Sequence, residues 1–95
     1  MLLRSMVNDM LKAIGQNVPS TYWDSEFVVA EVHRTPLSKY VVSKCTKAGK
    51  TVINLREWYC TASDPNWKPS KNGITVPQGD AARHVINTML EANAL

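Results

Sequence analysis

Aromatic and cationic side chains are interleaved within one short stretch of the sequence, REWYCTASDPNWKPSKNG, which runs from Arg56 to Gly73. It holds three rings and three cations but only two acids. A buried core would contain the rings but not the charges. An ordinary solvated loop would contain the charges but few rings. Single-stranded nucleic acid needs both, because its phosphates attract cations and its unstacked bases pack on flat rings. The stretch is therefore a candidate surface for an unpaired polynucleotide.

The positive charge of the chain is concentrated in its middle. The whole chain has a net charge of +3 and a pI near 9.0. Eight cations and three acids lie between Glu31 and Gly73, a local charge of +5, whereas the rest of the chain carries −2. This asymmetry favours a polyanionic partner. A basic face that simply contacts solvent is the alternative.

Length and composition argue against several other classes of protein. A chain of 95 residues with 44% hydrophobic and 20% charged residues is typical of one small folded domain. No apolar run approaches the roughly 18 residues of a membrane span, and the first residues lack the features of a secretory signal. We therefore expect an intracellular protein, in the cytoplasm or nucleoid of a bacterial cell or in a eukaryotic nucleus.

No cofactor, metal site or catalytic centre is predicted. Cys45 and Cys60 lie fifteen positions apart without the further ligands that zinc requires. His33 and His84 are more simply explained as surface or half-buried side chains than as catalytic bases, because no nucleophile or paired acid lies at a recognisable spacing. We expect a protein that is not an enzyme.

Hydrophobic periodicity predicts a helix, a set of strands and a second helix. Residues 2–14 carry apolar side chains at helical spacing, and so does the segment from Pro77 to Leu95, with Asp80 as the expected N-cap. Between them, β-branched segments predict strands at 26–32, 39–47, 51–60 and 74–76. The intervening segments 17–25 and 61–73 have the composition of loops.

A hairpin is expected to fix the register in the middle of the sheet. If Ala48 and Gly49 form a two-residue turn, Lys47 faces Lys50. The same register sets two further pairs, Cys45 opposite Val52 and Cys60 opposite Leu37. The two thiols then lie roughly 25 Å apart at the usual strand rise, too far for a disulfide within one chain.

Alternation along the strand at 51–60 divides its side chains between two faces. One face carries Val52, Asn54, Arg56 and Trp58, and the other carries Ile53, Leu55, Glu57 and Tyr59. Arg56 and Tyr59 then point apart unless the strand bulges. Trp58 could equally be a core ring, so the choice of the exposed ring stays open. In the following loop, Asn72 and Gly73 tolerate positive φ, which would let backbone N–H groups meet a phosphate.

The segments GKTVINLREWY and WKPSKNGITV, followed by a terminal helix, resemble the single-stranded-DNA-binding domain of the eukaryotic transcriptional positive coactivator. That family has bacterial and bacteriophage members, of which this chain is expected to be one, and plant Whirly proteins share a related fold. The resemblance extends from about Lys39 to the C-terminus. It implies an α+β fold, with a strongly curved four-stranded antiparallel sheet, a C-terminal amphipathic helix and dimers paired through the helices. Residues 1–25 would be an N-terminal extension and residues 26–95 the binding domain.

The resemblance also implies which residues contact DNA. The matching positions are Lys50, Arg56, Tyr59, Lys68, Lys71 and the loop glycine, Gly73. Asn72 stands where the family usually has a cation. With the cations and rings indicated by composition, the candidate nucleic-acid-binding residues are Lys44, Lys47, Lys50, Arg56, Trp58, Tyr59, Trp67, Lys68, Lys71, Asn72 and Gly73.

The expected function is that of a non-catalytic homodimer that binds single-stranded DNA with little sequence preference, in DNA replication, recombination or transcription. Two alternatives stay open. One is a binder of RNA or melted duplex, and the other is a protein-interaction or regulatory module with a basic docking face. Replication or transcription proteins are further expected partners, and the N-terminal helix could support assemblies larger than a dimer.

Overall fold

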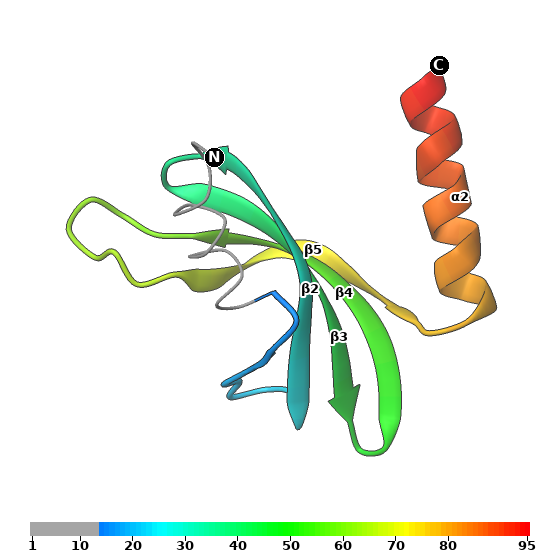
Figure 1. The fold of residues 1–95 in the computed structure, drawn as a ribbon, viewed down its shortest axis with the longest axis horizontal. Coiled ribbons are helices and arrows are strands. Elements are labelled where there is room, and N and C mark those ends of the chain that lie inside the picture. Colours follow the sequence, from blue (N-terminus) through cyan, green and yellow to red (C-terminus); the bar gives the residue numbers. More distant parts are fainter. Residues whose placement is uncertain (1–13) are drawn as a thin grey trace.

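Five antiparallel strands, each paired with its neighbour in the sequence, form one open sheet that is followed by a helix (Figure 1). The computed structural model describes residues 14–95. Its elements are β1 (Asn17–Val18), β2 (Ser25–Thr35), β3 (Ser38–Lys47), β4 (Lys50–Tyr59), β5 (Lys68–Pro77) and α2 (Asp80–Ala94). The predicted α+β class is confirmed, while the predicted helix at 2–14 falls, except for its last residue, outside the described residues.

The prediction of four strands was wrong, because the segment expected to be a loop before β2 contains a further short strand. β1 is only two residues long and pairs with β2 through Asn17 opposite Phe27 and Val18 opposite Glu26. So short a strand leaves no periodicity in the sequence. It is formed by pairing with the free edge of β2 rather than by its own propensity.

β5 is longer than the predicted strand at 74–76, because it begins at Lys68. The segment from Lys68 to Gly73 is therefore strand and not loop, and Gly73 does not have a positive φ. Turn-forming residues in this segment suggested a loop. β5 lies at the edge of the sheet, where Pro69 can be accommodated even though it has no N–H to donate.

The predicted hairpin between β3 and β4 is confirmed. Lys47 pairs with Lys50, and Cys45 pairs with Val52. At the tip, Ala48 has φ 52° and Gly49 has φ 78°, the positive values that a two-residue turn between twisted strands requires. The same register continues beyond β4, where the Cys60 N–H donates to the Leu37 carbonyl at 3.0 Å.

Both cysteines are free thiols. Cys45 is fully buried, and this burial raises the pKa of its thiol above 9.0, although a contact with Ser43 opposes the shift. Cys60 is half-buried at the start of the loop that joins β4 to β5.

The two faces of the sheet differ in burial. The face that carries Arg56 and Trp58, hereafter the groove face, also carries the most deeply buried side chains of the sheet, which are Glu26, Val28, Val41, Ser43, Cys45 and Asn54. The opposite face exposes large apolar side chains such as Phe27, Val32 and Tyr40. Alternation along β4 is therefore as predicted.

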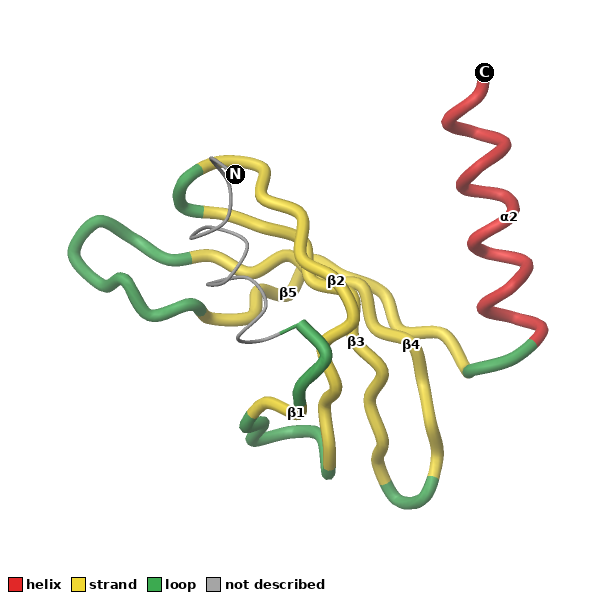
Figure 2. Tube along the Cα trace, viewed as in Figure 1, coloured by secondary structure: helices red, strands yellow, loops and turns green. Residues whose placement is uncertain are grey.

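The helix α2 stands away from the sheet, and β5 is the strand that it contacts most (Figures 1 and 2). Gly79, with φ 115°, is the N-cap residue, so the prediction of Asp80 as N-cap was wrong. Asp80 is instead the first helical residue, where its charge suits the helix dipole, and it pairs with Arg83 at 3.1 Å. Within residues 14–95, no helix combines the length and the apolar character needed to cross a membrane.

The apolar stripe predicted on the C-terminal helix is mostly uncovered. Ala82 is the one buried residue of α2, whereas Ile86, Met89 and Leu90 are 54%, 51% and 64% exposed. These three lie within one turn and face the same side of the helix. Nothing else in the described part of the chain covers them.

Candidate nucleic-acid interface

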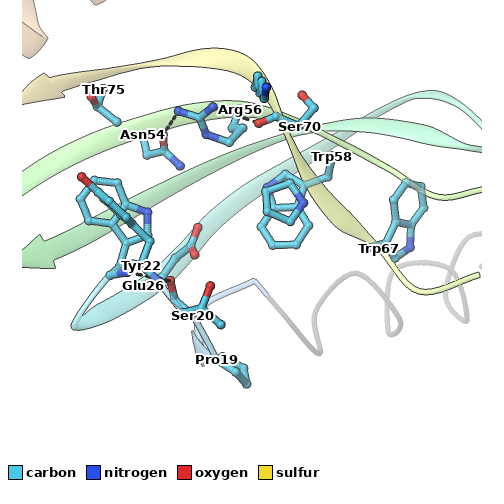
Figure 3. A pocket seen from close by; sticks show the side chains of 14 residues that line it. Pro19, Ser20, Tyr22, Glu26, Asn54, Arg56, Trp58, Trp67, Ser70 and Thr75 are labelled. Carbon is cyan, nitrogen blue, oxygen red and sulfur yellow. Dashed lines mark hydrogen bonds between the residues drawn. The ribbon is translucent and has the colours of Figure 1, made fainter.

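A groove of about 600 Å³ lies on the groove face of the sheet (Figure 3). Four of the predicted site residues line it together: Arg56, Trp58, Trp67 and Lys71. One wall comes from the segment 19–23, which precedes β2. The groove thus combines cations and rings from β4, from β5 and from the loop between them, as the interleaved sequence suggested.

Arg56 is held in place at the groove by two hydrogen-bond acceptors. Its guanidinium donates to the Ser70 carbonyl at 3.0 Å and to Asn54 Oδ1 at 3.5 Å (Figure 3). Asn54 is itself only 1% exposed, so it forms a fixed floor. Because a guanidinium has five N–H donors, Arg56 retains further donors for an anion in the groove.

Trp67 packs on a buried ion pair. Lys39 Nζ lies 4.5 Å from the centre of the Trp67 ring and 2.8 Å from Glu31 Oε1. The side chains of Lys39 and Glu31 are 10% and 5% exposed, and His33 meets the ring edge-on at 5.8 Å between centres. These contacts fix the orientation of a ring that comes from a long loop.

Trp58 is a half-buried ring in the groove wall rather than a fully buried core residue. Its indole N–H is buried and has no hydrogen-bond partner among the described residues, which is unusual for a tryptophan in a protein interior. An acid also reaches the groove, since Glu26 lines it. Glu26 is 4% exposed and accepts a hydrogen bond from the Ser43 hydroxyl at 2.8 Å.

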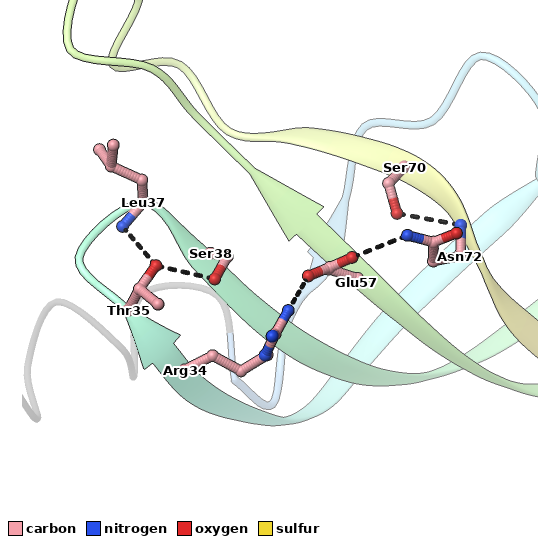
Figure 4. A network of polar contacts seen from close by, with 7 residues as sticks. All are labelled: Arg34, Thr35, Leu37, Ser38, Glu57, Ser70 and Asn72. Atoms are coloured by element: carbon pink, nitrogen blue, oxygen red, sulfur yellow. Dashed lines mark hydrogen bonds and ion pairs between the residues drawn. The ribbon is translucent and has the colours of Figure 1, made fainter.

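Lys71 lies in β5 where the strand register shifts. Arg56 pairs with Gly73 and Trp58 pairs with Pro69, so three residues of β5 lie opposite Glu57 alone. Pro69, Lys71 and Gly73 share the groove face by alternation along β5. Lys71 lines the groove, whereas Asn72 turns to the opposite face and donates to Glu57 Oε1 at 2.9 Å (Figure 4).

Gly73 allows this close approach of β5 to β4. A Cβ at this position would lie 2.5 Å from the Leu55 carbonyl oxygen and 2.9 Å from Arg56 Cα. These are backbone atoms that cannot move aside as a flexible side chain would. The glycine is therefore required by strand packing, and not by the positive φ of a phosphate-binding loop.

The tip of the β3–β4 hairpin lies at one end of the groove. Lys47 and Lys50 share the groove face by alternation with Val52 and Asn54, and both lysines are exposed. The Lys47 ammonium lies 3.6 Å from the centre of the Tyr22 ring, and Tyr22 lines the groove. The tip thus adds positive charge next to an aromatic ring.

Four other predicted residues are directed away from the groove. Alternation along their strands places Lys44, Tyr59 and Lys68 on the opposite face, and Asn72 faces Glu57 there. Lys68 forms an ion pair with Asp64 at 2.7 Å, which raises the pKa of Lys68 and lowers the pKa of Asp64. The structure therefore joins Lys50, Arg56 and Lys71 on one face and separates Lys68 from them.

The residues not identified from the sequence include two that line the groove, Asn54 and Tyr22, and one that packs on Trp67, Lys39. Asn54 stands among apolar neighbours in a strand, and that polar interruption was the available signal. Lys39 was counted only as part of the basic block. Tyr22 was assigned to a loop by composition, and no local pattern connects residue 22 with a hairpin tip 25 positions later.

Residues 39–82 match the family model described as Transcriptional Coactivator p15 (PC4). The similarity to this family is confined to these residues, which make up less than half of the chain. The PC4 family is known for single-stranded-DNA binding and transcription coactivation. The matched segment spans β3, β4, β5 and the first residues of α2, and it contains Arg56, Trp58, Trp67 and Lys71. Comparisons with curated proteins and with solved structures gave no match.

Proposed function

We propose that the chain is a non-catalytic homodimeric protein that binds single-stranded DNA with little sequence preference. The observation that carries the proposal is the groove in which Arg56 and Lys71 lie beside Trp58 and Trp67. All four residues come from the segment that matches the PC4 family. A groove of this kind suits a flexible strand that presents phosphates to the cations and bases to the rings.

Little sequence preference is expected because of the chemistry of these contacts. Every base has a face that can stack on a ring, and every phosphate carries the same charge. Duplex DNA fits less well, because its bases are already stacked and cannot reach Trp58 or Trp67 without melting. The DNA process served is replication, recombination or transcription, in a bacterial cell or its phage or in a eukaryotic nucleus.

Homodimer formation is supported by the exposed stripe of α2. Ile86, Met89 and Leu90 together present an apolar surface that faces no other element of residues 14–95. A second copy of the same helix, related by a two-fold axis, would cover this stripe with an identical one. The groove lies on the sheet and not on this stripe, so DNA binding and self-association use separate surfaces.

The test is a titration of labelled oligonucleotides with the full chain, followed by fluorescence anisotropy at several salt concentrations. With about four phosphates neutralised per site, log K falls with a slope near −3 against log salt, which is roughly fifty-fold between 50 and 200 mM. Replacing one cation of the groove, Lys71→Gln, reduces the slope by about 0.7. Affinity that is independent of salt would contradict the proposal.

A matched control and two competitors complete this test. Arg83→Gln removes an exposed cation from α2, outside the groove, and should leave the slope unchanged. If unlabelled RNA of the same sequence displaces the labelled oligonucleotide as well as unlabelled DNA does, the result would favour an RNA binder. Absence of binding to any nucleic acid would favour a module that docks an acidic protein partner.

A further inference from the structure

The segment from Pro19 to Asp24 is pinned to the tip of the β3–β4 hairpin. Ser20 Oγ accepts hydrogen bonds from the N–H groups of Tyr22 at 3.2 Å and Trp23 at 2.8 Å. The Asp24 N–H donates to the Thr46 carbonyl at 2.9 Å, and the Asp24 carboxylate accepts from the Ala48 N–H at 2.8 Å. The segment is therefore a built part of the groove wall, although it lies outside the residues that match the family.

Tyr22 is the exposed ring of this segment. Lys47 donates to the Tyr22 carbonyl at 2.8 Å, and its ammonium lies 3.6 Å from the centre of the ring. Trp23 meets the ring edge-on, with centres 4.8 Å apart and planes at 89°. The ring is thus oriented by a cation and by a second aromatic, yet it stays 61% exposed.

The exposed ring of Tyr22 is one of several aromatic rings that line the same groove, and a contiguous apolar surface of this kind indicates a ligand site. Tyr22 lies toward one end of the groove and Trp67 toward the other, with Trp58 between them (Figure 3). The three rings therefore lie at successive positions along the groove.

The geometry points to Tyr22 as a base-stacking residue that extends the nucleic-acid site to the hairpin end of the groove. Its ring takes a base, and Lys47 beside it neutralises the adjoining phosphate. This inference rests on the proposed function, since it assigns a further contact for the same polynucleotide. The segment from Pro19 to Asp24, for which the sequence predicted no role, then becomes part of the binding surface.

The test compares Tyr22→Leu with Tyr22→Phe in the full chain, by anisotropy with labelled oligothymidylates of increasing length. Leucine keeps apolar bulk but removes the π-face, so affinity should fall by about 5- to 150-fold for oligomers long enough to reach the hairpin tip. Phenylalanine keeps the ring and should bind as the unmodified protein does. The loss should be smaller for the shortest oligomers that still bind, because they can occupy the groove at Trp58 alone.

Tyr40→Leu is the matched control. Tyr40 is also exposed, at 40%, and also lies beside a cation, Arg34, but it belongs to the opposite face of the sheet. The Tyr40→Leu substitution should leave DNA affinity unchanged. Equal binding by Tyr22→Leu and the unmodified protein would overturn the inference while leaving the proposed function intact, whereas failure of the unmodified protein to bind would overturn both.

A second measurement covers the case in which Tyr22→Leu does not fold. The unmodified protein is photocrosslinked to an oligonucleotide that carries 5-iodouracil, and the modified residue is identified by mass spectrometry. A crosslink at Tyr22 supports the stacking contact. Crosslinks confined to other residues, at saturating oligonucleotide, would overturn it.

Discussion

Among the four glycines, Gly73 is the one at which a side chain would meet neighbouring atoms, because a Cβ at the other three would have no atom within 4 Å. The absence of a side chain lets β5 approach the backbone of β4 at Leu55 and Arg56, at the point where the strand register shifts. Lys71 lies in this shifted part of β5 and lines the groove. A residue without any functional group therefore permits the strand pairing next to a candidate phosphate contact.

Gly73→Ala should destabilise the fold by about 1–3 kcal/mol, because the added methyl group would overlap backbone atoms that cannot move aside. Urea denaturation measures the change in the free energy of unfolding. Gly49→Asn is the control, since space at Gly49 is open and asparagine tolerates its positive φ. It should cost less than about 1 kcal/mol, and an equal loss in both variants would contradict the steric explanation.

At the same scale, the sequence was a good guide to the central residues of the groove and a poor one to its ends. Arg56 and Trp58 share a regular strand, so alternation alone placed them on one face. Lys68 could not be placed in this way, because a strand was not expected there. Tyr22 could not be found at all, because its position depends on contacts with the distant residues Thr46, Lys47 and Ala48.

Among the elements, three strands are linked on the opposite face by the Glu57 carboxylate of β4. It pairs with Arg34 of β2 and accepts a hydrogen bond from Asn72 of β5 (Figure 4). The Asn72 hydrogen bond, together with the charge of Arg34, holds the pKa of Glu57 below its ordinary value of 4.5. The Glu57 carboxylate thus contacts both Arg34 and Asn72 in its charged form.

The stability supplied by these contacts should depend on pH. Because the pKa of Glu57 is lower in the folded than in the unfolded chain, the contribution is complete above about pH 4.5 and is lost as the pH falls through the folded value. Glu57→Gln should therefore lower the free energy of unfolding at neutral pH, and the difference from the unmodified protein should shrink in acid. Urea denaturation across this range measures it.

Asp80→Asn is the control for this pH series. It removes a carboxylate that is 99% exposed and that contacts only Arg83 within its own helix. A difference between Glu57→Gln and the unmodified protein that stays constant from neutral to acid pH would contradict the assignment.

The strands also show why some elements could be predicted and others could not. The β3–β4 hairpin was predicted pair by pair, since a two-residue turn fixes the register of everything that follows it. Most of β5 was not predicted, because Pro69 and Gly73 suggest a loop when the neighbouring strand β4 is not considered. Pairing with the edge of β4 outweighs that local preference.

For the whole molecule, the decisive surface is the exposed stripe of α2. Met89→Glu places a charge within the stripe, where dimer formation would bury it without a partner. Self-association should weaken by about 100-fold or more, as measured by sedimentation equilibrium. Thr88→Glu adds the same charge to the other side of the helix and should leave the dimer intact; dissociation by both variants, or by neither, would contradict the proposed pairing.

The contrast between the two thiols has a practical consequence for observing motion. Cys45 is sealed within the sheet with its pKa raised, whereas Cys60 is half-buried beside a loop. Of the two, only Cys60 is open to a thiol reagent while the sheet is closed. Cys45 can react only when the strands separate. The rate at which Cys45 is modified would therefore measure how often the sheet opens locally.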